Sequence, residues 1–367
     1  MAYVSYHQCQ RRIVIATCVI FVLWSAAALL AAEGAATAAP ATAPVSNGTL
    51  KVIWRSACGK SADTPAAADA KRIIAAAQGD IVAAFSPVDG KPLWTARPKS
   101  RPSSAMLLTD TAVFFGCTDG LVCALDAATG KARWTFQTQQ QIIGRPALAG
   151  DRLLIGSYDT HLYCLSADTG KELWNFQTTA QVHAAPLIAG DIVIIGGCDG
   201  SLHAIDLANG QERWAVGAGG PIGASPILSD SQIFAANLSC TVLSTDRAGK
   251  LLWSVSPFAE PSQVTARPAN SSGRLAVVAD DGQLVILNSA DGKVIAQGKL
   301  PGKPTAGLVF HNDQLLVGVD DGRIHIIDPA TARETSRITL GGDPLSIIPM
   351  DQGIFANTSD GSLWLLR

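Results

Sequence analysis

Tryptophan recurs in this 367-residue chain at intervals of about forty residues. The repeated positions are Trp54, Trp94, Trp134, Trp174 and Trp214, spaced 40 residues apart, and Trp253, which follows after 39. The same frame continues to Ala296 and Ser336, which take the place of the tryptophan. Spacing this regular indicates tandem repeats of one structural unit, so the length of the chain does not require several unlike domains.

A second frame places a turn signal upstream of each unit's tryptophan. Five of these signals are Asp-Gly pairs, which end at Gly120, Gly200, Gly282, Gly322 and Gly361. Asp159-Thr160 matches in part, and Gln78-Gly79 and Leu238-Ser239 are degenerate members. Asp-Gly between apolar runs is typical of a two-residue hairpin turn, because glycine tolerates positive φ and aspartate bonds its own backbone.

The apolar residues of each unit alternate with a period of two. Residues 152–156 before one turn and 202–206 after another are examples, and a short apolar run after a proline begins each unit. Each unit therefore holds four short strands, and helical repeats of similar length are excluded because their period is 3.6. Repeated four-stranded units of about forty residues predict a β-propeller.

Eight tryptophan-type strands and eight turn signals give eight blades over residues 49–367. The run Leu50–Trp54 comes first, and the chain ends within a third strand at Leu363–Leu366. We therefore predict an all-β, eight-bladed propeller of four-stranded antiparallel blades, in which the N-terminal strand completes the last blade and closes the ring. Closure would leave no unpaired sheet edge.

The first 48 residues differ in composition from the repeats. Arg11 and Arg12 precede residues 13–32, an uncharged apolar run that predicts one N-terminal helix. Residues 1–32 are interpreted as a signal peptide or an uncleaved signal anchor, with both possibilities open, and residues 33–48 as a tether rich in Ala, Pro and Thr. The propeller is therefore predicted to lie outside the cytoplasm, in the periplasm or cell envelope.

Charge and composition exclude two classes of protein. The formal net charge is −2, so the chain has no bulk positive field to hold nucleic acid. Hydrophobic residues make up 48% and charged residues 16%, which argues against disorder and for a large buried core.

The run Ala-Leu-Asp-Ala-Ala-Thr-Gly-Lys-Ala-Arg-Trp at 124–134, with similar copies at 164–174 and 204–214, resembles the pyrroloquinoline-quinone (PQQ) type propeller repeat. That repeat occurs in quinoprotein dehydrogenases and in cofactor-free scaffolds similar to BamB, a subunit of the outer-membrane β-barrel assembly machinery. The resemblance implies a non-catalytic scaffold for protein–protein interaction with partners in the envelope. An envelope sensor or sugar-binding propeller is the alternative, and a PQQ-dependent dehydrogenase is less favoured.

The residues that quinoprotein dehydrogenases use are not evident. The resemblance would imply acidic and amide ligands for Ca²⁺ and a vicinal Cys pair, whereas no two cysteines are adjacent here. Three of the five glutamates, Glu172, Glu212 and Glu334, share one repeat position. We predict no catalytic residue, no cofactor and no metal site, and a monomeric propeller that contacts the membrane only if its N-terminal segment stays uncleaved.

The remaining candidates are structural, apart from four arginines. The six tryptophans are expected to wedge between blades, His203 and His325 to fill one packing slot, and Cys117 and Cys123 to be buried thiols or, less favoured, a disulfide. Arg97, Arg101, Arg145 and Arg267 lie on or next to the loops that enter each first strand, and form a candidate partner surface. The alternative is that they pair with turn aspartates such as Asp119, Asp199 or Asp281.

Overall fold

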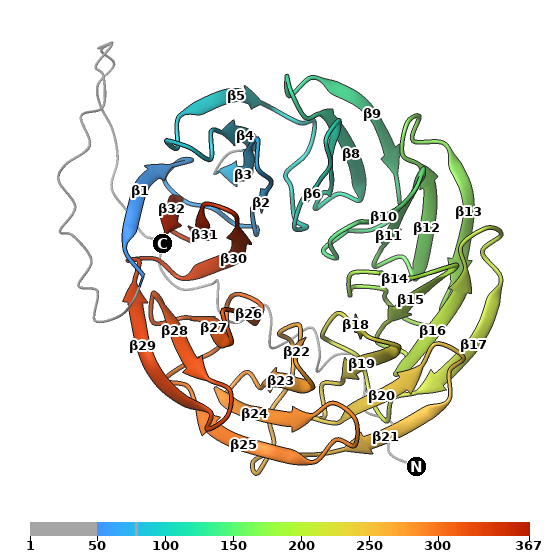
Figure 1. The fold of residues 1–367 in the computed structure, drawn as a ribbon. Helices are drawn as coiled ribbons and strands as arrows, with labels where there is room; N and C mark the ends of the chain where they lie inside the picture. The colour runs from blue at the N-terminus through green and yellow to red at the C-terminus, as the bar shows by residue number, and fades with distance from the viewer. Residues whose placement is uncertain (1–49, 78–79) are drawn as a thin grey trace, which may run out of the picture. The chain divides into compact units, whose positions relative to one another are not determined.

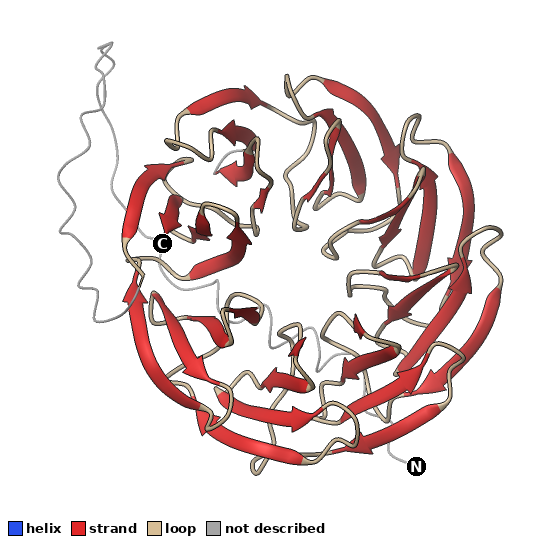
Figure 2. Ribbon diagram, viewed as in Figure 1, coloured by secondary structure: helices blue, strands red, loops and turns tan. Residues whose placement is uncertain are grey.

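Strands are the regular secondary structure that the computed structural model shows in residues 50–77 and 80–367, the part of the chain that it describes (Figure 2). They form eight four-stranded antiparallel sheets, arranged as blades around a central opening (Figure 1). The all-β, eight-bladed architecture is as predicted. The predicted helix at 13–32 and the tether lie outside the described residues, and among those described no helix is long and apolar enough to cross a membrane.

Blades I to IV follow one another along the chain, each running from its innermost to its outermost strand. Blade I holds β2 (Ala67–Ala68), β3 (Ile73–Ala77), β4 (Ile81–Phe85) and β5 (Pro92–Ala96). Blade II holds β6 (Leu107–Leu108), β7 (Ala112–Gly116), β8 (Leu121–Asp126) and β9 (Ala132–Gln137). Blade III holds β10 (Ala147–Ala149), β11 (Arg152–Gly156), β12 (His161–Ser166) and β13 (Glu172–Gln177), and blade IV holds β14 (Leu187–Ala189), β15 (Ile192–Gly196), β16 (Ser201–Asp206) and β17 (Glu212–Gly217).

Blades V to VIII complete the set. Blade V holds β18 (Ile227–Ser229), β19 (Gln232–Ala236), β20 (Val242–Asp246) and β21 (Leu251–Val255). Blade VI holds β22 (Ala269–Ser271), β23 (Arg274–Val278), β24 (Gln283–Asn288) and β25 (Val294–Lys299). Blade VII holds β26 (Val309–His311), β27 (Gln314–Val319), β28 (Arg323–Asp328) and β29 (Arg333–Thr339), and blade VIII holds β30 (Pro344–Met350), β31 (Gly353–Thr358), β32 (Ser362–Leu366) and β1 (Val52–Ala57).

The outermost strand of blade VIII comes from the beginning of the described chain. β1 pairs antiparallel with β32, with Arg55 opposite Trp364, and Lys51 and Arg367 exchange two backbone hydrogen bonds beyond the ladder. The two ends of residues 50–367 are therefore held in one sheet.

Burial differs systematically across a blade. The second strand is buried along its whole length in β3, β7 and β15, because neighbouring blades cover both faces of the sheet. The outermost strand alternates between exposed and half-buried residues, as in β13 and β17, because only one of its faces meets another blade. The core is thus a set of apolar layers between blades.

The hairpins between the second and third strands are longer than predicted. Four residues, 117–120 or 197–200, join the strands, so the prediction of two-residue turns is wrong. Such a turn of type I′ needs positive φ at both residues, whereas here Gly120 has a φ of +85° and Asp119 does not adopt positive φ. Asp119 instead accepts the N–H of Leu121 at 3.1 Å, which fixes the turn through its side chain.

Candidate functional site

Each repeat tryptophan joins its blade to the next one. The indole of Trp174 on β13 donates a hydrogen bond to the carbonyl of Leu207 in blade IV at 3.1 Å, and the indole of Trp134 donates to Ala167 at 2.9 Å. Trp54, Trp94, Trp214 and Trp253 donate in the same way to Pro87, Ala127, Arg247 and Ser289. The rings are half-buried, so the tryptophans lie over the outer part of each boundary and the deep core is made by smaller residues.

The five turn glycines, Gly120, Gly200, Gly282, Gly322 and Gly361, all adopt positive φ, between +75° and +87°. In the degenerate turns other residues occupy this position: Thr160 has a φ of +74°, and Cys240, rather than Ser239, has a φ of +62°. The turn of blade V therefore lies one residue later in the chain than the sequence pattern indicated. Gln78 and Gly79, the other degenerate turn, lie outside the described residues.

Two of the four candidate arginines lie on the outer loops. Arg97 and Arg101 are exposed in the loop that leads from blade I to blade II. Arg101 pairs with Asp63 at 2.6 Å, and Arg97 forms no ion pair with any described residue. The loop contacts the turn that holds Asp119, because the N–H of Thr118 donates to the carbonyl of Arg101 at 3.0 Å.

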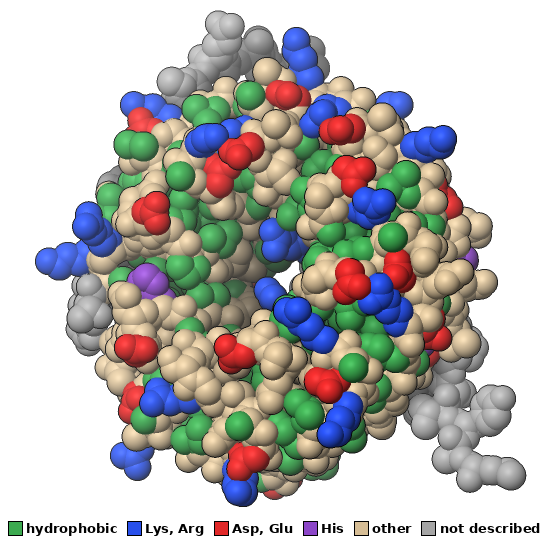
Figure 3. Space-filling view, turned by 45° about the vertical axis from the view of Figure 1, so that its right-hand side comes forward, with side chains coloured by type: hydrophobic (Ala, Val, Ile, Leu, Met, Phe, Trp, Pro, Cys, Tyr) green, Lys and Arg blue, Asp and Glu red, His purple; other side chains and the backbone are tan. Residues whose placement is uncertain are grey.

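The other two candidate arginines line a channel of about 680 Å³ at the axis of the propeller. All eight blades contribute to its wall, through their innermost strands or the residues just before them. Arg145 and Arg267 each stand before the proline that leads into an innermost strand, of blade III and blade VI respectively. Basic side chains are visible around the central opening in Figure 3.

Neither channel arginine has a carboxylate partner among the described residues. The Nε of Arg145 donates to the carbonyl of Met106 at 3.1 Å, and Arg267 makes no hydrogen bond or ion pair with any residue that the structure describes. The aspartates that were candidates for pairing bind elsewhere: Asp199 pairs with His203 at 2.8 Å and Asp281 with Lys299 at 2.8 Å. The alternative that these two arginines are neutralised by turn aspartates is therefore wrong.

The two channel arginines carry like charges with no counter-charge beside them. Both residues are exposed to the solvent of the channel, and the surrounding protein atoms, which displace part of their water, lower the pKa of Arg145 and of Arg267. Repulsion from Arg267 lowers the pKa of Arg145 further. Guanidinium groups stay protonated in proteins, so two uncompensated positive charges face one cavity.

One ionisable side chain besides the arginines lines the channel. His183 lies in its wall, and its Nδ1 is 3.6 Å from the Sγ of Cys198. Burial lowers the pKa of His183, which favours the neutral imidazole. The sequence did not lead us to place His183 in the channel. The available signal was its position two residues before Ala185, which is the blade IV equivalent of Arg145.

The sequence matches a family model described as outer membrane protein assembly factor BamB, over residues 43–144, 118–254 and 198–299. The chain belongs to the BamB family. Its structure is similar to that of BamB from Moraxella catarrhalis, with a TM-score of 0.76 at 22% identity over 87% of this chain and 98% of that one. A search of curated protein sequences gave no match.

Two further solved structures share the fold of this BamB-family propeller. The computationally designed protein Ika8 has a TM-score of 0.74 at 19% identity, covering 83% of this chain and 96% of that one. A europium-containing methanol dehydrogenase has a TM-score of 0.73 at 13% identity, covering 84% of both chains. At these identities the likeness shows the eight-bladed fold alone.

The channel of this BamB-family chain does not suit a metal-bound quinone. The resemblance to quinoprotein dehydrogenases implies carboxylate and amide oxygens around Ca²⁺, and the wall holds no Asp, Glu, Asn or Gln side chain. Elsewhere in the described ranges, no three His, Cys, Asp or Glu side chains are grouped as metal ligands. The cationic wall would repel a metal ion.

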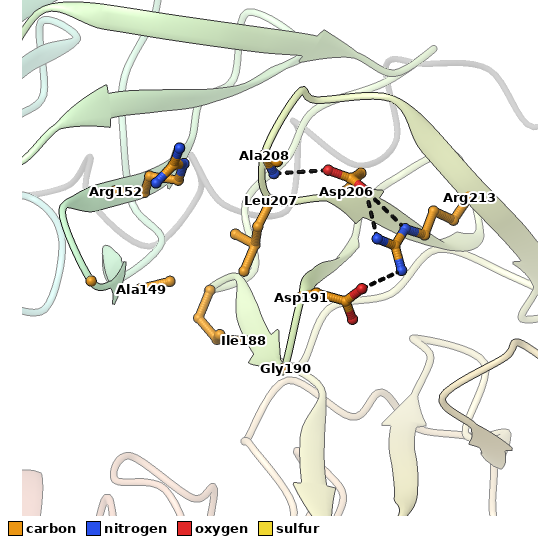
Figure 4. A pocket seen from close by; sticks show the side chains of 10 residues that line it. Ala149, Arg152, Ile188, Gly190, Asp191, Asp206, Leu207, Ala208 and Arg213 are labelled. Atoms are coloured by element: carbon orange, nitrogen blue, oxygen red, sulfur yellow. Dashed lines mark hydrogen bonds and ion pairs between the residues drawn. The ribbon is translucent and has the colours of Figure 1, made fainter.

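A second hollow, of about 540 Å³, lies between blades III and IV, beside the turns that join first to second and third to fourth strands (Figure 4). Arg213 points into it and pairs with Asp191 at 2.6 Å and Asp206 at 2.5 Å. Arg152 across the hollow pairs with Asp151 at 2.7 Å. The charges here are satisfied within the protein, in contrast to those of the axial channel.

The two histidines of the packing slot, His203 and His325, also contact carboxylate groups. His203 lies between Asp199, at 2.8 Å, and Glu212, at 2.6 Å, and its pKa is raised because these hydrogen bonds outweigh the opposing effect of burial. The fully buried His325 has the same arrangement, with Asp321 and Glu334 both at 3.1 Å. The prediction of a packing slot missed both networks, although Asp at i−4 and Glu at i+9 recur in the two blades.

The cysteines of the described residues are free thiols in this structure. Cys117 and Cys123 are buried, with their sulfur atoms 3.8 Å apart. The preferred interpretation of these two residues as small buried thiols agrees with this geometry.

Proposed function

We propose that this chain is a non-catalytic scaffold outside the cytoplasm that holds partner proteins during assembly in the cell envelope. The observation that carries the proposal is the match to the outer membrane protein assembly factor BamB model across residues 43–299. The basic pair Arg11-Arg12 before the apolar run at 13–32 supports export. The propeller acts as a monomer, tethered to the membrane if residues 1–32 are retained.

The partner surface is the face that carries the loops between blades. Arg97 is exposed there without an ion-pair partner in the described chain, and Arg101 is exposed beside Asp63. Exposed arginines that keep free hydrogen-bond donors are common anchors at protein interfaces. Arg145 and Arg267 border the inner edge of the same face, so a partner can extend from the outer loops toward the axis.

Crosslinking in intact membranes, followed by identification of the captured proteins, tests this proposal. The variant Arg97→Glu/Arg101→Glu reverses charge on the proposed surface, and Lys131→Glu/Lys171→Glu reverses it on the opposite face as a matched control. We expect the first variant to lose the captured envelope proteins and the second to retain them. Capture of the same proteins by both variants would contradict the surface, and calcium-dependent dye reduction by the purified chain would contradict a non-catalytic role.

A further inference from the structure

At one position of the repeat, two blades carry an arginine and the other six carry an uncharged residue. The strand registers place eight residues at equivalent positions before or within the innermost strands: Pro65, Ala105, Arg145, Ala185, Ser225, Arg267, Gly307 and Ser346. All eight line the channel. Six are small or apolar and uncharged, so the repeat itself does not demand a cation here.

The two arginines also lack a counter-charge. Both are exposed to the solvent of the channel, they carry like charges, and no Asp or Glu lines the channel. Like charges that face one cavity repel one another unless a counter-ion lies between them. An anion bound between them would remove the repulsion and supply charge-assisted hydrogen bonds to donors that have no protein acceptor.

The remainder of the wall limits what that anion can be. Ala105, Met106, Leu107 and Ile188 give it an apolar surface. Two hydroxyl groups are already used as donors, because Thr265 donates to Asp280 and Ser346 donates to Asn357, whereas Ser225 accepts the N–H of Ala185 and keeps its own O–H. The guanidinium groups are therefore the charged donors that the wall can offer a ligand, with the Ser225 hydroxyl as a neutral one.

A small organic carboxylate fits these conditions better than a hydrated inorganic oxyanion. Two carboxylate oxygens match the two parallel N–H groups of a guanidinium, whereas phosphate would leave further oxygens against apolar carbon. A cavity of about 680 Å³ lies within the roughly 300–1,000 Å³ range of small-molecule sites. We propose that the axial channel binds a small organic carboxylate with an apolar body, held by Arg145 and Arg267. This goes beyond the scaffold function and does not depend on Arg97 or Arg101.

Isothermal titration calorimetry with the purified full-length chain tests the proposal. The probes are benzoate and benzene-1,4-dicarboxylate, with benzamide as the neutral control and inorganic phosphate as the hydrated oxyanion. We expect both carboxylates to bind, benzamide not to bind, and phosphate to bind at least tenfold more weakly. Binding should weaken as ionic strength rises, because the recognition is electrostatic.

Variants locate the site. Arg145→Gln and Arg267→Gln should each weaken carboxylate binding about tenfold or more, and the double variant should abolish it, while Arg97→Gln leaves binding unchanged. Because the two charges repel, the melting temperature of the ligand-free double variant should equal or exceed that of the wild type, so loss of binding cannot be attributed to unfolding. Failure of the carboxylates to bind, equal binding by the double variant, or binding of phosphate as tight as that of the carboxylates would each overturn the proposal. Membrane crosslinking through Arg97 and Arg101 is a separate readout and can succeed when this one fails.

Discussion

Six of the blade boundaries in the described propeller carry a tryptophan, and the two boundaries on either side of blade VII do not. Where Trp174 or Trp214 lies over the next blade, a hydrogen bond and a flat ring join the two sheets. In blades VI and VII the same position holds Ala296 and Ser336, paired with β24 and β28 respectively. Both kinds of boundary bury their second strands, since β15 is buried along its whole length and β27 is buried except at Gln314.

The cross-strand partner of the tryptophan position explains how both kinds of boundary are filled. Small residues stand opposite tryptophan, namely Ala84, Ala124, Cys164, Ala204 and Ser244. Ile286 and Ile326 stand opposite Ala296 and Ser336. Where the outermost strand has a small residue, the neighbouring strand has a large one. The total side-chain volume at the boundary is therefore maintained, as close packing requires. Blade VIII departs from the pattern, with Trp54 opposite Leu365.

The presence or absence of the tryptophan also decides whether a glycine is needed in the following blade. Gly170 lies beneath Trp134, and a Cβ atom at Gly170 would approach the ring to 2.5 Å. The equivalent residue opposite the boundary without tryptophan, Ala332, has a Cβ and still adopts a φ of +54°. Glycine is thus required by the ring above it more than by the turn itself.

The largest effect should come from removing β1, which would extend the region without tryptophan to a third boundary. Deleting residues 50–57 takes Trp54 and the outermost strand from blade VIII and exposes the edge of β32. We expect a loss of roughly 5 kcal/mol or more of unfolding free energy, and aggregation on heating. Urea unfolding measures it, with deletion of residues 41–48 as the length-matched control. Equal stability of the two deletions would show that the pairing of β1 with β32 is dispensable.

Trp174→Ala tests the tryptophan boundary directly. The half-buried ring and its hydrogen bond to Leu207 are lost, so we expect a cost of about 3 kcal/mol in urea unfolding. Ser336→Ala, at the same repeat position in blade VII, should change stability by less than about 0.5 kcal/mol. Cys164→Ile in the Trp174→Ala background should recover part of the loss by supplying the volume that Ile286 supplies in blade VI. If the isoleucine adds nothing, the volume argument is wrong.

Gly170→Ala should cost about 2 kcal/mol more than Gly150→Ala. Both glycines have positive φ, +73° and +60°, so both substitutions carry the same kind of backbone strain. A Cβ at Gly150 meets nothing within 4 Å, while one at Gly170 meets the indole of Trp134. Thermal unfolding of the two variants therefore isolates the clash. The excess should disappear in the Trp134→Ala background, and its persistence there would locate the strain in the turn.

The fold could be predicted almost completely from the sequence, because blade number, strand number and the tryptophan positions follow from periodicity. Turn length was wrong because Asp119 fixes its turn through a side-chain bond, which composition does not distinguish from a tighter hairpin. The alternative prediction that Arg145 and Arg267 pair with turn aspartates was also wrong. Such pairing depends on distances across the ring between blades that are far apart in sequence. Sequence spacing places both arginines near the axis, but it cannot show that the turn aspartates pair elsewhere.

The histidine networks provide the smallest expected effect, and they occur on both sides of the comparison, in blade IV beside Trp214 and in blade VII beside Ser336. The hydrogen bonds of His203 to Asp199 and Glu212 raise its pKa above the ordinary 6.5 despite burial, and the pKa of Asp199 is lowered from 3.8 because the bond to His203 overcomes burial. A raised histidine pKa stabilises the folded state below about pH 6.5, and this contribution is lost as the pH rises through the folded-state value. Asp199 stays ionised down to below pH 3.8, so both charges are present at pH 5.5.

We therefore expect His203→Gln to destabilise the chain by roughly 0.5–1 kcal/mol more at pH 5.5 than at pH 9 in urea unfolding. The partly exposed position of Glu212 keeps the value small through solvent screening. Lys131→Gln, far from the network, controls for general effects of pH. A destabilisation that is the same at both pH values would mean that His203 contributes packing alone, as the packing slot that it shares with His325 first indicated.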